Sequence, residues 1–464
     1  MPEATVSQRA EAGRTARKQA PRASQSELRV APDRDPIALL EEQARSRLPE
    51  LVPVRYGRML TSPFAFFRGA AIVMAHDLVG TPAAGLSAQL CGDAHLANFG
   101  GFASPERDLV FDLNDFDETL PGPFEWDIKR LATSFEIAAR DRGFSAAERG
   151  GPVLTAMRTY RQAMQHFATM GDLDVWYSRL DAGSITARLN EAHDRKAQKS
   201  FQKGAAKAQT RDRMRALAKL TEQVNGQPRL ISDPPLIVPL RELVQDQSAR
   251  AELEGALHGM FLRYVQTVPR DLRTLLEGFR YADLARKVVG VGSVGTRCWV
   301  LLLLGRDERD PLFLQIKEAQ TSVLEPLIGR SRFGNHGRRV VEGQRLMQAA
   351  SDIFLGWVRS DVTLDGEVRD FYVRQLWDWK ASADLQTIRP EGLAAYAEAC
   401  GWILARAHAR SGDRFAVSAY LGKGDSFDRA IAAFATAYAD LNERDHDALV
   451  QAVKAGRITA TEGV

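Results

Sequence analysis

The chain has 464 residues, of which 45% are hydrophobic and 26% charged, and its formal net charge is +3, values that are ordinary for an enzyme of two or three globular domains. The longest apolar run, residues 298–304, is too short to span a bilayer, and the N-terminus lacks the apolar core of a signal peptide, so we expect a cytoplasmic protein without membrane association. Three scattered cysteines form neither a zinc pattern nor a disulfide framework.

The chain begins with a basic segment followed by short helices. Residues 1–34 hold seven Arg or Lys and four Asp or Glu with little apolar periodicity, so we predict that residues 1–36 form a flexible arm. A short helix is predicted at 37–51. An apolar helix is predicted at 63–78, because Ser62 followed by Pro63 is typical of a helix start.

Two apolar strands and the polar residues after them carry the strongest functional signal. Strands are predicted at 86–90 and 109–113. Asp93 and Asn98 are five positions apart, which is the spacing of a kinase catalytic loop, where the Asp orients the acceptor hydroxyl and the Asn reaches a metal. In an extended segment Asp115 and Asp117 would share a face and repel each other unless a cation lies there. The pattern therefore predicts a phosphoryl-transfer site with Mg²⁺, for which Asp112 is a further candidate ligand.

Plainer interpretations of this segment stay open. Asp, Asn and Gly form turns, so Gly92-Asp93 and Asn114-Asp115 could be ordinary loop residues between strands. His95 could bind a metal or only form a hydrogen bond. Cys91 could be a nucleophile, but its neighbours make it first a strand-end residue.

Helices are predicted from 124–140 through about residue 275. Within them, residues 195–219 hold nine basic residues and one acid, Asp212. A basic helix of this kind could meet nucleic acid or an acidic partner. The segment has few aromatic residues for base stacking, with Phe201 alone among them, so the pattern favours a solvated helical face.

A glycine-rich turn marks the next part of the chain. Gly290, Gly292 and Gly295 have the spacing of a dinucleotide-binding turn, but the apolar run 298–304, a turn and a strand at 312–317 follow instead of a helix. This order of strands, ending in Lys317, is typical of a kinase amino-terminal lobe. There the backbone of 290–295, which includes Ser293, would close over nucleotide phosphates, and the lysine would neutralise them.

Lys317 lies on an otherwise apolar strand, where an unpaired ammonium is costly, so it needs an anion. Phosphate is one candidate. Glu342, on a helix predicted at 338–350, is the expected protein partner, with Glu318 and Glu325 as substitutes. A strand-end lysine that reaches water is the alternative.

Further elements follow this helix. Strands predicted at 352–359 and 370–379 would complete a five-stranded lobe, and amphipathic helices are predicted at 393–409 and 425–441.

The motifs resemble those of the aminoglycoside-phosphotransferase branch of kinase-like proteins. Residues 92–98 are similar to its catalytic loop, with Cys91 where that branch usually has His, and Asp115-Phe116 is similar to its metal motif. Residues 126–132 resemble the helix start that follows. Over nearly its full length, including the stretches 62–69 and 343–348, the chain resembles the bacterial family named domain of unknown function 2252, which implies kinase-like ancestry without an established activity.

The order of the motifs departs from the kinase pattern, because Asp93 precedes Gly290 and Lys317. A circular permutation would explain this order. The resemblance then implies an α+β, two-lobed protein-kinase-like fold, circularly permuted, with a five-stranded lobe and a larger helical lobe. The expected domains are a helical lobe at 37–277, a nucleotide-binding lobe at 278–385, and C-terminal helices at 386–464 that pack back on the helical lobe.

On this interpretation ATP lies between the lobes. Lys317 and residues 290–295 would hold its phosphates, Asn98, Asp115 and Asp117 would hold Mg²⁺, and Asp93 would orient the hydroxyl of an unknown small-molecule or protein acceptor. Two other functions stay open: a nucleotide-binding regulator or nucleotidyltransferase, and a nucleic-acid-binding protein that uses the basic segments.

Overall fold

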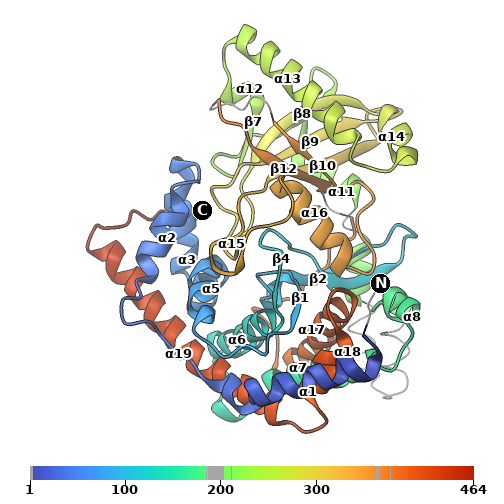
Figure 1. The fold of residues 1–464 in the computed structure, drawn as a ribbon. Coiled ribbons are helices and arrows are strands. Elements are labelled where there is room, and N and C mark those ends of the chain that lie inside the picture. The colour runs from blue at the N-terminus through green and yellow to red at the C-terminus, as the bar shows by residue number, and fades with distance from the viewer. Residues whose placement is uncertain (1–3, 184, 186–202, 211, 361–365, 377) are drawn as a thin grey trace.

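The computed structural model describes residues 4–183, 185, 203–210, 212–360, 366–376 and 378–464. Its elements form a sheet-centred part, at the top of Figure 1, and a helical part below it. Helices and strands are both well represented and are largely segregated, so the expected α+β class is confirmed.

The largest sheet has six strands in the order β11-β12-β10-β9-β8-β7, and each neighbouring pair is antiparallel. The prediction of a five-stranded lobe is therefore wrong. The added strand, β7, is three residues long, with two prolines shortly before it and a third at its end, so it has no alternating pattern to reveal it. The strands of this sheet are β7 (Ile237–Pro239), β8 (Arg280–Lys287), β9 (Cys298–Leu304), β10 (Pro311–Glu318), β11 (Gly356–Arg359) and β12 (Asp370–Gln375).

Both faces of this sheet are covered, which explains the uninterrupted apolar run of β9. Val300 and Leu302 lie in the core beneath α11, whereas Leu301 and Leu303 lie in the core beneath α13. The predicted boundary between 277 and 278 therefore separates segments that share a core, and Figure 1 shows α12, α13 and α14 beside the large sheet. The helices concerned are α11 (Arg213–Leu220), α12 (Leu240–Leu243), α13 (Gln247–Val265) and α14 (Arg270–Glu277).

The helical part has its own core, built mainly from α6, α7, α17 and α19. Helix α17 packs along α7, and α19 packs on α6, so the C-terminal helices lie beside the N-terminal half of the chain (Figure 1). The helices of this part and its border with the sheet are α2 (Pro36–Ala44), α3 (Val52–Leu60), α6 (Glu125–Asp141), α7 (Ala146–Phe167), α8 (Asp172–Tyr177), α15 (Glu325–Ile328), α16 (His336–Met347), α17 (Pro390–Ser411), α18 (Arg414–Leu421) and α19 (Ser426–Lys454).

The N-terminal segment is ordered by helix α1 (Val6–Gln19), which corrects the expected flexible arm. A capping box closes its start, and its inner face packs against α18. Arg9 pairs with Asp413 at 2.8 Å, and Arg17 donates to the carbonyl of Tyr420 at 3.0 Å. Arg17 thus contacts the partially negative C-terminal end of α18, whereas Arg9 pairs with Asp413 at the start of that helix. A sequence count of charges does not reveal these interactions.

The helix predicted at 63–78 is two helices, α4 (Pro63–Gly69) and α5 (Ala71–Val79), separated at Ala70. The prediction at 37–51 likewise covers α2 and a short 3₁₀ turn, Pro49–Leu51. Further 3₁₀ turns lie at Arg22–Ser26 and Leu96–Asn98.

Short two-stranded sheets carry the loops that matter for function. Strand β1 (Ser87–Leu90) pairs with β4 (Leu120–Pro123), and β2 (Phe99–Ala103) pairs with β3 (Leu109–Leu113). A third pair, β5 (Thr221–Val224) with β6 (Gln227–Leu230), lies elsewhere. Within the described ranges no helix combines the length and apolarity needed to cross a membrane.

Candidate active site

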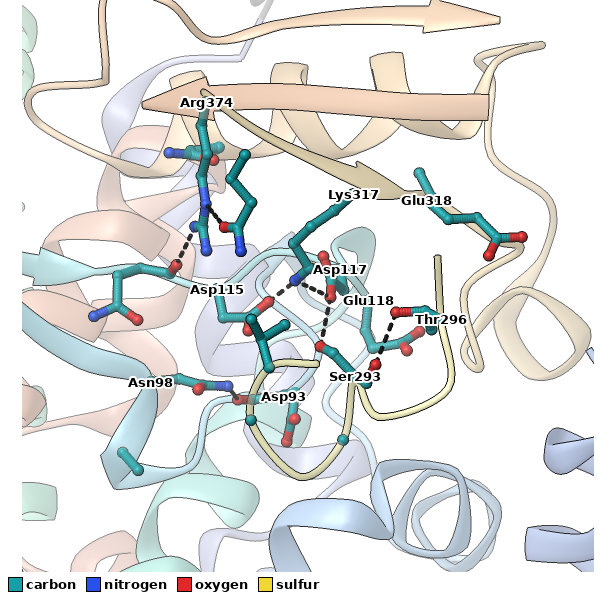
Figure 2. A pocket seen from close by; sticks show the side chains of 18 of the residues that line it. Asp93, Asn98, Asp115, Asp117, Glu118, Ser293, Thr296, Lys317, Glu318 and Arg374 are labelled. Atoms are coloured by element: carbon teal, nitrogen blue, oxygen red, sulfur yellow. Dashed lines mark hydrogen bonds and ion pairs between the residues drawn. The ribbon is translucent and has the colours of Figure 1, made fainter. Parts of the chain in front are cut away.

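A cleft of about 1280 Å³ lies where the large sheet faces the helical part. It is lined by the loop after β1, the segment after β3, the glycine-rich turn between β8 and β9, and the facing side chains of β10 and β12. Figure 2 shows that these side chains point toward one another across the cleft. Residues separated by some two hundred positions in the sequence are thereby brought together.

The loop after β1 is fixed by its backbone. The Asp127 carboxylate, in the first turn of α6, accepts hydrogen bonds from the amides of Cys91 at 2.8 Å and Gly92 at 3.1 Å. Gly92 has a φ of +83°, and a Cβ there would lie 2.4 Å from the carbonyl oxygen of Glu118. The loop is therefore held against the segment after β3 at a spacing that only glycine permits.

Asp93 is the carboxylate of this loop that faces the cleft. Arg130 of α6 binds it at 2.8 Å and is itself fixed by the carbonyl of Phe67 at 2.7 Å. Burial raises the pKa of Asp93, and Arg130 and then Arg68 oppose that rise. Asn98 donates from Nδ2 to the backbone carbonyl of Asp93 at 2.9 Å, which leaves its amide oxygen for another partner.

His95 and Cys91 lie in the same loop as Asp93, and burial shifts the pKa of each side chain. Burial, followed by the charges of Arg68 and Arg130, lowers the pKa of His95 well below its usual value, so the ring is neutral near pH 7. Its Nε2 lies 3.6 Å from Asp93 Oδ2. Burial also raises the pKa of Cys91 well above its usual value, which keeps the thiol protonated and suits a strand-end residue rather than a nucleophile.

Lys317 and Asp117 form an ion pair across the cleft. Lys317 Nζ lies 2.6 Å from Asp117 Oδ2, and the hydroxyl of Tyr372 donates to Oδ1 at 2.6 Å. Burial acts to lower the pKa of Lys317, but the charges of Asp115 and Asp117 outweigh it and raise that pKa. Burial likewise acts to raise the pKa of Asp117, but Lys317 and Tyr372 hold it below its usual value. Both groups are therefore charged at neutral pH.

The candidate metal ligands differ in how far they are already engaged. Burial and the charge of Asp117 raise the pKa of Asp115, which has the environment of a carboxylate that gains from a cation. Asp117 is already engaged in an ion pair with Lys317 and accepts a hydrogen bond from Tyr372. Asp112 is enclosed with Arg406 and also accepts from the amide of Ala349 at 3.0 Å, so it is not a cleft ligand.

In the described part of the chain no group of three or more His, Cys, Asp or Glu side chains is arranged to hold a metal ion. A Mg²⁺ ion here would therefore rely on Asp115 and Asn98, with water and phosphate oxygens completing its shell, which is the usual manner of Mg²⁺ binding beside phosphates.

The glycine-rich turn is clamped to the helical part by two arginines. Arg47 donates to the carbonyls of Gly292 at 2.8 Å and Val294 at 2.5 Å, and Arg58 donates to that of Gly290 at 2.5 Å. Gly290, Gly292 and Ser293 line the cleft, and Ser293 Oγ lies 3.4 Å from Asp117 Oδ2 (Figure 2). The remaining member of the predicted set, Gly295, is not among the lining residues. A Cβ at that position would lie 3.0 Å from Arg47 Cβ, so this glycine serves packing.

Glu342 is not the partner of Lys317. It lies 3.5 Å from Arg338 of its own helix, with a side chain 36% exposed, and it borders a different, smaller pocket. The two substitutes are also engaged elsewhere, Glu318 with Arg297 and Arg369 and Glu325 with Arg339. Helical periodicity locates α16, but it cannot tell which side chain of the helix faces a strand that precedes it.

Besides Arg47 and Arg58, four further arginines shape the cleft and are not predicted by the sequence. Arg339 of α16 donates to the carbonyls of Asp117, Thr119 and Gln320, each at 2.8 Å, and so ties the carboxylate segment to the sheet. Arg374 of β12 binds Gln315 at 2.9 Å and the carbonyl of Asn114 at 3.0 Å. Arg68 and Arg130 are the others. An arginine within an apolar β12 was the one available sequence signal, since such a charge needs a partner.

The basic segment 195–219 is only partly visible, because residues 195–202 and 211 lie outside the described residues. Residues 213–219 belong to α11, which covers one face of the large sheet, and Arg213 pairs with Asp310 at 2.7 Å. This part of the segment therefore packs against the protein itself.

The model of a family described as an uncharacterized protein conserved in bacteria, DUF2252, matches residues 47–452. No curated protein and no solved structure matches the chain.

Proposed function

We propose that the chain, which belongs to the bacterial family DUF2252, is an ATP- and Mg²⁺-dependent phosphotransferase. The description of that family names no activity, so the proposal rests on the cleft alone. One observation carries the proposal. The Lys317–Asp117 pair, 2.6 Å long, joins the sheet to the carboxylate segment at the place where Asp93, Asn98 and the glycine-rich turn also open into the cleft. A lysine, three carboxylates and a glycine-rich turn around one space are the groups that phosphoryl transfer requires.

The proposed roles follow from the contacts. Asp93, oriented by Arg130, would accept the proton of the acceptor hydroxyl. Lys317 would exchange Asp117 for nucleotide phosphate, and the backbone of Gly292 and Ser293 would border the same phosphates. The bond between the terminal phosphorus of ATP and its bridging oxygen breaks, ADP leaves with that oxygen, and a bond forms to the acceptor oxygen. The side chains supply position and charge, not a covalent intermediate.

The donor set fits Mg²⁺. Asp115 supplies a half-buried carboxylate whose pKa is raised, first by desolvation, and Asn98 has an amide oxygen not used in its bond to Asp93. When bound, the ion would neutralise negative charge that develops on the phosphate oxygens. Asp117 would join it only after release from Lys317.

We further propose that the two parts are the lobes of a kinase-like fold in permuted order. Three features support this. The glycine-rich turn joins β8 to β9, and Lys317 lies on β10, the next strand of the large sheet. The Asp93 loop and Asp115 lie on the helical side, and the C-terminal helix α17 contacts β1, which leads into the loop.

Nucleotide binding provides the first test. We expect Mg²⁺ and ATP together to raise the melting temperature of the full chain, and Lys317→Ala or Asp115→Ala to abolish most of that rise. Asp141→Ala, at an exposed position at the end of α6, is the matched control and should respond like the unchanged protein. A rise of equal size in all three variants would contradict the proposed site.

Turnover provides the second test, with transfer to water as the acceptor-independent readout. Asp93→Ala should retain ATP binding but lose at least about 100-fold in release of labelled terminal phosphate, the range expected when a general base is removed. Undiminished turnover would reject the role of Asp93. Release of pyrophosphate instead would indicate nucleotidyl transfer, and saturable binding without either product would indicate a nucleotide-binding regulator.

A further inference from the structure

Arg68 has a position in the cleft that none of the roles above uses. It lies in the last turn of α4, lines the cleft on its helical side, and its backbone supports the tip of the glycine-rich turn. A Cβ on Gly292 would lie 3.2 Å from the Arg68 carbonyl oxygen. Arg68 therefore stands beside the part of the turn that faces Asp117, across the cleft from the sheet.

The guanidinium of Arg68 contrasts with that of Arg130. Arg130 is satisfied by Asp93, the carbonyl of Phe67 and a stacking contact 3.8 Å from the Phe67 ring centroid. Among the described residues the buried Nε of Arg68 has no hydrogen-bond partner, and the guanidinium lies 5.9 Å from the centroid of the Phe64 ring. Within the described ranges no hydrogen bond or ion pair engages any part of this guanidinium, so it is a cation of the cleft that can still bind an anion.

The surrounding charges indicate what that group is. Burial lowers the pKa of Arg68, while Asp93 and Asp115 act to raise it, so the guanidinium lies within the electrostatic reach of both carboxylates. A phosphoryl group that approached Asp93 without a nearby cation would be repelled by these two charges. Lys317 is held on the opposite side by Asp117.

We propose that Arg68 binds the terminal phosphate of the nucleotide and holds it beside Asp93 during transfer. The anion closest to the residue that receives the acceptor proton is the group being transferred, and among the described residues Arg68 is a cation on that side that no hydrogen bond or ion pair engages. A guanidinium donates two parallel hydrogen bonds to phosphate oxygens, which fixes orientation as well as charge. This inference rests on the proposed function, and its test is chosen to separate the two.

The test compares ATP with ADP, which lacks the phosphate in question. We expect Arg68→Ala to weaken binding of Mg²⁺ with a non-hydrolysable ATP analogue by about ten-fold, as for a lost hydrogen bond to a charged group, and to change ADP binding by less than about two-fold. Both affinities would be measured by titration calorimetry on the full chain. Arg68→Lys should recover part of the difference, because it keeps the charge but not the paired donors.

Two controls keep the outcome interpretable. Arg142→Ala removes one positive charge at an exposed site outside the cleft and should leave both affinities unchanged. Because Arg68 Nε has no partner to lose, the melting temperature of the ligand-free variant should stay close to that of the unchanged protein.

The possible results separate the two proposals. Equal weakening of ATP and ADP, or no weakening of either, would overturn the role of Arg68 while leaving the proposed function intact. Failure of the unchanged protein to bind either nucleotide would overturn both.

Discussion

Two kinds of aspartate pair lie within a few residues of each other, and they differ in how their carboxylates are enclosed. In the Asp112–Arg406 pair the side chains are 3% and 0% exposed, so neither can meet a ligand. In the Lys317–Asp117 pair the cation is 3% exposed but the carboxylate 29%, so its carboxylate opens to the cleft. The Arg130–Asp93 pair is also open in this sense, because the Arg130 side chain is 4% exposed and that of Asp93 is 19% exposed. A closed pair stabilises the fold, whereas an open pair has a carboxylate that can change partners.

The largest expected effect breaks the closed pair. Arg406→Met should lower the free energy of unfolding by about 3–5 kcal/mol, because Asp112 is then buried without its cation. Chemical denaturation measures this loss, and Arg142→Met at an exposed site is the control. Replacing both partners, as in Asp112→Leu with Arg406→Met, should recover much of the stability. A cost for the single variant no greater than that of the control would show that the pair is not structurally important.

The second largest effect concerns the close approach of the Gly92 loop, which carries Asp93, to the segment that carries Asp117 and Glu118. Gly92→Ala should cost at least about 2 kcal/mol, because a side chain at positive φ is strained and its Cβ would meet the Glu118 carbonyl at 2.4 Å. Gly85→Ala is a matched control, since Gly85 has a φ of +72° but no atom within 4 Å of the added Cβ. The excess cost of the first variant over the second measures the close approach alone. Equal costs would mean that the two loops can separate freely.

The sequence predicts much of the local secondary structure but fewer of the side-chain contacts between distant segments. Strand β3 and strand β9 were predicted with their actual ends, because each is a short apolar run bounded by turn residues. Asp93, Asn98, Asp115 and Lys317 line one cleft, the first three from loops that follow strands and Lys317 from strand β10 itself. The kinase-like order and the roles of these residues stay predictions.

The side-chain contacts that the sequence did not predict depend on the three-dimensional packing of distant segments. The sequence predicts Glu342 as the partner of Lys317 because it is on the next predicted helix, whereas the observed partner, Asp117, is two hundred positions away. Arg68, Arg130 and Arg339 were missed because an arginine on a helix usually faces solvent, and only the packing of α4, α6 and α16 turns them inward. The sequence does not distinguish Asp112 from Asp115 and Asp117, because its partner, Arg406 of α17, is almost three hundred positions away.

The third effect removes the cation from an open pair. Lys317→Met should destabilise the ligand-free protein by about 1–2 kcal/mol, less than the closed pair, because the Asp117 carboxylate keeps access to water. Without Lys317, burial and the charge of Asp115 would raise the folded-state pKa of Asp117 above its unfolded value. Stability is then lost as pH rises through that pKa, so the variant should be closest to the unchanged protein below pH 5. Denaturation at pH 5 and pH 8 tests this sign, and a larger deficit at pH 5 would contradict it.

The smallest effect comes from a third kind of cleft carboxylate, whose donors are backbone amides. Asp352 accepts from the amides of Phe354 at 2.8 Å and of Gln375, yet burial outweighs these bonds and raises its pKa to about 6. A raised carboxylate pKa means that the folded state holds a proton that the unfolded state has released, so stability should fall as pH rises from about 4 to about 6. Asp352→Asn should flatten that part of the denaturation profile. Asp384→Asn should not, because the Thr387 hydroxyl lowers the pKa of Asp384 and moves its titration below this window. An unchanged slope in Asp352→Asn would place Asp352 with the open pairs, as a carboxylate that stays ionised.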